Sequence, residues 1–155
     1  MAKKHILNPL LLENQLCFPL YASARKIVAA YNPFLKSIGL TYAQYVTMMV
    51  LWEEKSITMH DLGERLYLDS GTLTPVLKKL EAMGYLERYR KPEDERLVMI
   101  SLTDKGISLR EEAEKIPHQM SDQLNKGETL FTEKEVKVLK EQLYKLLQAL
   151  EQREE

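Results

Sequence analysis

The sequence predicts a mainly α-helical protein with one small β-hairpin, an α+β fold arranged as a winged helix-turn-helix with N- and C-terminal dimerisation helices. Apolar residues recur at helical spacing through most of the chain, and the period becomes strand-like after Gly84. A short helix, a turn and a longer helix precede that change. In this order the longer helix enters the DNA major groove, and the hairpin tip reaches the adjacent backbone or minor groove.

Length and composition fit this class. A chain of 155 residues forms one domain and buries roughly 70% of its unfolded surface, so it needs neither disulfides nor a metal. We expect a single domain over residues 1–155, with dimerisation helices at about 10–40 and 103–152 and the winged helix-turn-helix at about 42–102. The 22 basic and 23 acidic residues nearly cancel, so composition alone indicates neither a nucleic-acid nor a membrane partner.

The chain shows no targeting or membrane pattern. Lys3 and Lys4 precede only a brief apolar run, and no small-residue cleavage site follows it. The longest uncharged apolar stretch, around Tyr45 to Trp52, is far too short to cross a bilayer. We expect a soluble, cytoplasmic protein without a membrane partner.

Two prolines affect where the first predicted helix begins and ends. Apolar spacing predicts a helix from Leu10 to Tyr31 that stops at Asn32, because the residue before a proline avoids the helical region. A short turn of helix should follow over residues 34–38. Pro19 leaves two alternatives, since it either kinks the first helix or makes that helix begin near Cys17.

The helix-turn-helix is predicted from capping residues and leucine spacing. Thr41 caps a third helix, and Thr58, with an acidic residue three positions later, caps a short fourth helix. The longer helix, Ser70 to Met83, has apolar residues at spacings of three and four and a glycine after its end. Because Pro75 removes a hydrogen bond inside a helix, this helix could start as late as Thr72.

The remaining elements are the hairpin and two long helices. Strands are predicted at 86–90 and 97–102, joined by the charged loop KPEDER. One helix should run from Thr103 towards Gln123 and another from Thr132, which has a capping-box partner in Glu135. The wide apolar stripe of the last helix is most often intrachain core in proteins, but a homodimer would also bury it.

The polar face of the longer helix is a candidate DNA-binding surface. Hydroxyl and ammonium groups hydrogen-bond phosphates and base edges, and a helix N-terminus favours phosphate by itself. The alternative is an ordinary solvated face, which most helices have. The candidate residues are Asp69, Ser70, Thr72, Thr74, Lys78 and Lys79.

The charged hairpin tip is either a DNA-binding wing or an ordinary charged turn, and such turns are common. A DNA-binding wing needs basic groups held outward, and Lys91 and Arg96 are the candidates. A neighbouring carboxylate, Asp94, would orient Arg96 through a charge-assisted hydrogen bond.

Cys17, the only cysteine, lies among apolar residues, and a lone cysteine in such company is usually a small core residue. The histidines, His5, His60 and His118, lack metal-ligand spacing, and the chain has no glycine-rich phosphate loop and no CxxC pair. We therefore expect no metal, no cofactor and no catalytic site.

Two stretches carry a family resemblance. LDSGTLTPVLKKLEAMGYLERYRKPEDERLVMISLTDKG, residues 68–106, resembles the recognition helix and wing of the MarR family of dimeric repressors. ENQLCFPLYASARKIVAAY and GLTYAQYVTMMVLWE resemble the organic hydroperoxide sensors of the OhrR type. The resemblance covers residues 12–106, and the C-terminal helices match in pattern only.

The resemblance implies a dimeric repressor whose cysteine, matching Cys17, is oxidised by organic hydroperoxides, with release of operator DNA. It implies that tyrosines matching Tyr31 and Tyr42 hydrogen-bond the cysteine across the dimer interface, with Tyr21 nearby. It also places residues 69, 70, 72 and 74 in the DNA-reading helix and Arg96 at the wing tip. With a single cysteine, a disulfide to a second cysteine of this sequence is excluded, so a low-molecular-weight thiol must supply any mixed disulfide.

Two alternatives remain open. A MarR-type repressor could respond to a bound small aromatic ligand, with Cys17 structural and the aromatic residues lining a pocket. A thiol enzyme such as a one-cysteine peroxidase is the least favoured, because no peroxidase arginine motif lies near Cys17.

Overall fold

The computed structural model describes residues 8–152, so Lys3, Lys4 and His5 lie outside the described residues. The chain divides into two compact units, Met1–Pro117 and His118–Glu155, which are described separately. The prediction of a single domain stays a prediction.

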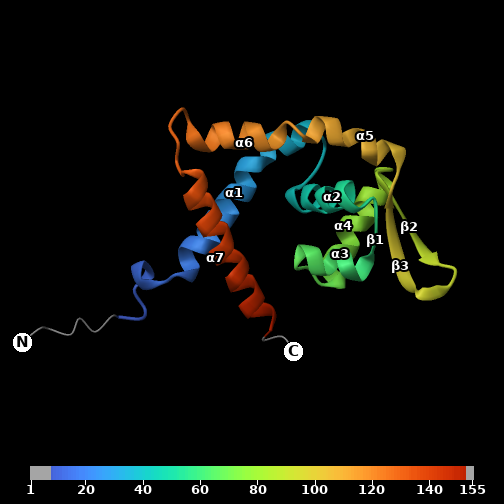
Figure 1. The fold of residues 1–155 in the computed structure, drawn as a ribbon, viewed down its shortest axis with the longest axis horizontal. Helices are drawn as coiled ribbons and strands as arrows, with labels where there is room; N and C mark the ends of the chain where they lie inside the picture. Colours follow the sequence, from blue (N-terminus) through green and yellow to red (C-terminus); the bar gives the residue numbers. More distant parts are fainter. Residues whose placement is uncertain (1–7, 153–155) are drawn as a thin grey trace, which may run out of the picture. The chain divides into compact units, whose positions relative to one another are not determined.

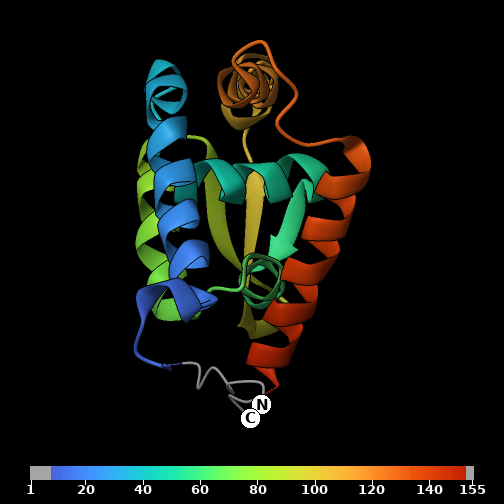
Figure 2. The same ribbon diagram turned by 90° about the vertical axis from the view of Figure 1, so that its left-hand side faces the viewer.

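The first unit begins with a short 3-10 turn, η1 (Leu12–Asn14), followed by helix α1 (Cys17–Ser37) (Figures 1 and 2). The prediction that the helix starts at Leu10 is therefore wrong, and the second alternative for Pro19 is correct. Pro19 is the third residue of α1, where a backbone amide would have no partner within the helix, so its missing N–H costs nothing there.

The predicted stop at Asn32 is also wrong, because α1 continues through Pro33 to Ser37. The proline removes one hydrogen bond, to the carbonyl of Ala29, which is exposed and open to water. The last turn is retained because Leu35 is fully buried in the core. Tertiary burial here outweighs the local preference.

The helices of the winged helix-turn-helix are α2 (Tyr42–Glu54), α3 (Met59–Leu66) and α4 (Ser70–Ala82), and α3 and α4 form the helix-turn-helix itself. The capping box of Thr41 and the cap at Thr58 are confirmed, and Gly84 follows α4 with a φ of 80°. The later start at Thr72 is wrong: Asp69 accepts the Thr72 amide at 2.8 Å, which fixes the start at Ser70. Pro75 therefore lies in the second turn of α4, where the carbonyl left without a partner belongs to the exposed Gly71.

The wing is a three-stranded antiparallel sheet rather than a two-stranded hairpin. Strands β2 (Leu86–Lys91) and β3 (Asp94–Leu102) form the hairpin, and β1 (Ser56–Thr58) pairs with the other edge of β3 in the order β1-β3-β2 (Figure 1). The predicted tip was too long, since only residues 92 and 93 separate the strands. The short β1 was not predicted, because three residues carry no periodic signal.

The core of the first unit lies where α2, α3, α4 and the base of the sheet meet. Helix α4 presents three leucines that are completely buried, Leu73, Leu77 and Leu80. Leu86 and Ile100 complete this core from the sheet, at 1% and 0% exposure. The leucine stripe predicted for the longer helix is thus intrachain core.

The predicted helix from Thr103 is two helices, α5 (Asp104–Ala113) and α6 (Ile116–Asn125). Pro117 explains the break, because it cannot donate to the carbonyl of Ala113 in a continuous helix but fits the first turn of a new one. The second unit contains α7 (Glu133–Glu151), and the capping box at Thr132 is confirmed.

Helix α7 has no buried residue, and all its large apolar side chains except the half-buried Leu147 are exposed. The predicted homodimer would cover them and stays a prediction. No helix among residues 8–152 is long and apolar enough to cross a membrane.

Gly106 is a point of close backbone packing in the first unit. A Cβ at this position would overlap the carbonyl oxygen of Tyr85, and the Gly106 carbonyl accepts a hydrogen bond of 2.8 Å from the indole of Trp52. The first turn of α5 is therefore in backbone contact with the corner between α4 and β2.

We expect Gly106→Ala to lower the free energy of unfolding by about 1–3 kcal/mol, because the backbone carbonyl of Tyr85 cannot move aside as a flexible side chain would. Urea unfolding measures this loss. Ser108→Ala, on the exposed side of the same helix, is the control and should change stability by no more than about 0.5 kcal/mol. Equal stabilities of Gly106→Ala and the control would contradict the close packing.

Candidate functional site

Cys17 is the first residue of α1, and its side chain is exposed in the single chain. The interpretation of this thiol as a buried core residue is therefore wrong for the single chain. Its neighbours Leu16 and Phe18 are also exposed, at 72% and 44%. Cys17 is therefore an accessible thiol at a helix N-terminus, with apolar neighbours on both sides.

Three tyrosines from α1 and α2 pack together in the first unit. The ring centroids of Tyr31 and Tyr42 are 5.1 Å apart, and that of Tyr45 lies 6.1 Å from Tyr31 and 6.4 Å from Tyr42. Burial, and secondarily the neighbouring Tyr42, raises the pKa of Tyr31, so its phenol remains a hydrogen-bond donor at neutral pH. Tyr45 was not among the predicted residues, although its position three residues after Tyr42 puts both on one helix face.

The structure brings Tyr31 and Tyr42 together but does not bring either to Cys17 within one chain. Cys17 and Tyr31 are fourteen residues apart on α1, which is about 21 Å along the axis. Tyr21 is one turn from Cys17, with 61% exposure, and the guanidinium of Arg25 lies 5.3 Å from its ring centroid. A contact between the thiol and the tyrosine pair therefore requires a second chain.

The predicted DNA-binding residues of α4 lie at its start and along its solvent side. Ser70, Thr72, Lys78 and Lys79 are exposed, and Thr74 is half-buried with its hydroxyl donating to the Ser70 carbonyl at 2.6 Å. Asp69 is also exposed, but both its oxygens are engaged by Thr72, through the amide at 2.8 Å and the hydroxyl at 3.0 Å. Asp69 thus acts first as the helix cap.

In the wing, Lys91 and Arg96 are exposed, as predicted. Asp94 accepts a hydrogen bond of 3.0 Å from the backbone amide of Arg96, and no ion pair joins their side chains among the described residues. In this structure Asp94 holds the backbone of Arg96 rather than its guanidinium, and the predicted orientation of the guanidinium stays a prediction. Sequence reasoning also missed the ion pair between Glu81 of α4 and Arg88 of β2, because the two are seven residues apart on different elements.

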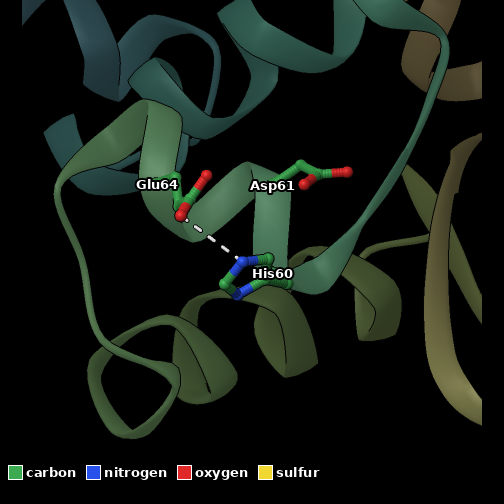
Figure 3. Close-up of side chains that lie close together, drawn as sticks. All are labelled: His60, Asp61 and Glu64. Carbon is green, nitrogen blue, oxygen red and sulfur yellow. Dashed lines mark ion pairs between the residues drawn. The ribbon is translucent and has the colours of Figure 1, made fainter.

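A cluster of His60, Asp61 and Glu64 lies on the exposed surface of α3, with possible ligand atoms within 4.8 Å of one another. The His60 ring and the Glu64 carboxylate face each other at 3.4 Å (Figure 3). Asp61 accepts a hydrogen bond of 2.7 Å from the hydroxyl of Thr58 at the helix start. These contacts are those of a helix cap and an exposed ion pair.

The fold and the exposed faces of α4 and the wing define a winged-helix DNA-binding regulator. The model of the transcriptional regulator family SarA/Rot matches residues 29–113. The chain is also 46% identical over 142 residues to the organic hydroperoxide resistance transcriptional regulator of Bacillus subtilis strain 168, covering 92% of this chain and 93% of the relative. The chain belongs to the MarR/SarA family of transcriptional regulators and is not an enzyme.

Further relatives include structures solved with DNA. AbfR of Staphylococcus epidermidis, in its reduced form bound to DNA, has a TM-score of 0.74 and 36% identity, covering 90% of this chain and 94% of that chain. A cysteine-to-serine mutant of MarR from E. coli complexed with operator DNA has a TM-score of 0.74 and 28% identity, covering 85% and 93%. The predicted fold class and family are confirmed.

The cap at Asp69 makes the stability of α4 dependent on pH. Hydrogen bonds from the Thr72 amide and hydroxyl lower the pKa of the Asp69 carboxyl, so the charged cap stabilises the folded state above the ordinary carboxyl range. The stabilisation is lost as the pH falls through this lowered pKa.

We expect the difference in unfolding free energy between wild type and Asp69→Asn to be constant from pH 6 to 8 and to shrink below about pH 4. Asparagine keeps an acceptor but does not titrate. Urea unfolding at each pH measures the difference, with the exposed Glu93→Gln as the control for general charge effects. A difference that persisted unchanged at low pH would show that the carboxylate charge is unimportant.

Proposed function

We propose that this protein is a cytoplasmic, homodimeric repressor that binds double-stranded operator DNA and releases it when an organic hydroperoxide oxidises Cys17. The observation that carries the proposal is the exposed sole thiol at the first residue of α1, in apolar surroundings. The similarity to an organic hydroperoxide resistance regulator over nearly the whole chain supports it. DNA would be contacted through the exposed residues of α4 and through Lys91 and Arg96 of the wing.

The oxidation is a two-electron transfer to the thiolate. The sulfur attacks the terminal oxygen of the hydroperoxide, the O–O bond breaks, and the alkoxide takes a proton and leaves as the alcohol. The cysteine becomes a sulfenic acid. A low-molecular-weight thiol can then displace water from the sulfenic acid to form a mixed disulfide, because the chain has no second cysteine.

The tyrosine pair gives the proposed dimer a chemical role. Tyr31 and Tyr42 lie too far along the fold to reach Cys17 of their own chain, but across an antiparallel pair of α1 helices they would reach that of the partner. Phenolic donors and the free amides at the start of α1 would both stabilise a thiolate. Oxidation replaces that thiolate and alters its hydrogen bonds.

Release would follow from a change in the spacing of the two α4 helices. Successive major-groove turns are about 34 Å apart, so moving the helices off that separation prevents both from binding at once. A shift from 99:1 to 1:99 needs about 5.5 kcal/mol, and one lost hydrogen bond contributes only about 1 kcal/mol. A mixed disulfide, repacking of the apolar surroundings, or both subunits together must supply the rest.

We expect Cys17→Ser to bind DNA as wild type does but to remain bound after addition of an organic hydroperoxide, because serine cannot be oxidised. The measurement is fluorescence anisotropy on a duplex that the wild-type protein enriches from a random pool. Hydrogen peroxide and a general thiol oxidant are run in parallel to rank the oxidants.

Each failure of this experiment has a distinct meaning. If Cys17→Ser released DNA after addition of the hydroperoxide, sensing by the thiol would be refuted, but DNA binding by the protein would not. A wild-type protein that enriches no duplex, or that sediments as a monomer at micromolar concentration, would refute the repressor itself.

Loss of the phenol at Tyr31 or Tyr42 should slow the oxidation of Cys17 by about tenfold or more, the effect of one charge-assisted hydrogen bond to the thiolate. Tyr31→Phe and Tyr42→Phe keep the packed rings and remove only the hydroxyl groups. Rates are followed by mass spectrometry of the protein without DNA. Tyr67→Phe, on the exposed turn after α3, is the control, and equal rates in all variants would exclude the proposed contact.

A hollow of about 190 Å³ in the first unit favours a second candidate function, regulation by a small aromatic ligand with Cys17 structural. Side chains of α2 form one wall, and the end of α5 and the start of α6 form the other. The cation at its rim, Arg110, is paired with Glu114 at 3.1 Å, so a neutral ring fits better than a carboxylate. Its lining residues are Tyr45, Met49, Trp52, Arg110, Ala113, Glu114 and Pro117. Ligand-induced release that is equal in wild type and Cys17→Ser would favour this candidate.

A further inference from the structure

Arg88 is a charged residue on the core-facing side of the wing. It pairs in register with Ile100, which is completely buried, and it is two residues from the buried Leu86 on the same face of β2. A charge in this position costs free energy unless it is paired and hydrogen-bonded. The side chain of Arg88 retains 24% exposure.

Glu81 of α4 provides the pairing. One carboxylate oxygen accepts from the Arg88 guanidinium twice, at 3.0 Å from Nε and 2.6 Å from Nη2, and the other accepts from the Arg88 backbone amide at 3.2 Å. Glu81 is four residues after Leu77, so it continues the buried stripe of α4 towards the wing. The hydrogen bond from Arg88 lowers the pKa of Glu81, which therefore remains charged at neutral pH.

Beyond this pair, the wing is braced internally. The guanidinium of Arg90 donates to the carbonyl of Glu95 across the hairpin at 2.6 Å, and Asp94 holds the Arg96 amide. The tip therefore behaves as one piece. Its attachment to α4 lies at the leucine core and, nearer the tip, at the contact between Glu81 and Arg88.

We propose that Glu81 and Arg88 are positioning residues that hold the wing at a fixed angle to α4, so that Lys91 and Arg96 reach phosphate when α4 is in the major groove. The inference rests on DNA binding by α4 and the wing, but not on peroxide sensing by Cys17. Neither residue needs to touch DNA. Without the pair, the wing would keep its fold and lose its defined direction.

Whether removal of the Glu81 carboxylate weakens or strengthens DNA binding distinguishes a positioning role from simple charge repulsion. Removing a carboxylate near DNA should strengthen binding, because phosphates repel it. Loss of the ion pair between Glu81 and Arg88, which we call the clamp, should weaken DNA binding, because the basic groups of the wing are no longer held where they reach phosphate. Glu81→Gln therefore discriminates between the two, and Glu87→Gln is a matched control, an exposed glutamate on the opposite face of the same strand.

The test uses full-length protein and a duplex of about 40 base pairs enriched from a random pool by the wild type, with affinities measured over a series of salt concentrations. We expect Glu81→Gln to bind about 100-fold more weakly, the effect of losing one charge-assisted phosphate contact from each wing of the proposed dimer. The slope of log K against log salt should become shallower by about 1.8 for the proposed dimer, one contact per wing. Glu87→Gln should bind as tightly as wild type or more tightly, with the same slope.

A second variant, Glu81→Leu, and a urea unfolding curve for each protein separate positioning from folding. Partial unfolding lowers the fraction of active protein without changing the salt slope, so an unchanged slope in a weakened variant would overturn the proposal. Binding by Glu81→Gln that equals or exceeds that of wild type would also overturn it. A wild type that enriches no duplex would refute DNA binding itself, which is a distinguishable result.

Discussion

The burial of one leucine stripe of α4 is the constraint on which the rest of the first unit depends. Leu73, Leu77 and Leu80 are completely buried, and fully burying three such side chains contributes about 5–9 kcal/mol, comparable to the net stability of a whole domain. The helix consequently cannot rotate about its axis. Its solvent side, with Lys78 and Lys79, is fixed by the same packing that makes the core.

A second constraint acts on α1. The helix begins at Cys17 with Pro19 in its first turn, where the missing amide costs nothing, so the thiol lies where backbone amides have no helical partner. The continuous helix then separates this thiol from Tyr31 by about 21 Å. On the proposed function, dimerisation is therefore a requirement of the thiol chemistry as well as a way to cover apolar surface.

The parts of the fold that could be predicted are those specified by local chemistry. The caps at Thr41 and Thr132 and the glycine after α4 follow from hydrogen bonds within a few residues. The errors occur where distant residues decide. Burial of Leu35 carries α1 past Pro33, and pairing of Ile57 with Ile100 makes a strand of three residues that have no pattern of their own.

The candidate site also has parts that could be predicted from nearby residues and parts that depend on residues far apart in the sequence. The exposed faces of α4 and the wing follow from apolar spacing, because what the core does not bury remains in solvent. The local sequence around Cys17 predicts a buried core residue, because a lone cysteine in apolar surroundings usually is one, and only the family resemblance indicates a redox role. The contact of Glu81 with Arg88 joins two elements whose angle is set by the fold, so neither residue signals its partner in the sequence.

The rigid connection of the wing to α4 bears on how a small chemical change could release DNA. A sensor that disturbed only one hydrogen bond would fall well short of the roughly 5.5 kcal/mol that a complete switch requires. If α4 and the wing move as one body, a single displacement removes the contacts of both. Charge-assisted hydrogen bonds are worth about 1.5–3 kcal/mol each, so roughly two to four lost together would suffice. The ion pair between Glu81 and Arg88 would then convert a small shift at the proposed dimer interface into complete loss of binding to one operator half-site.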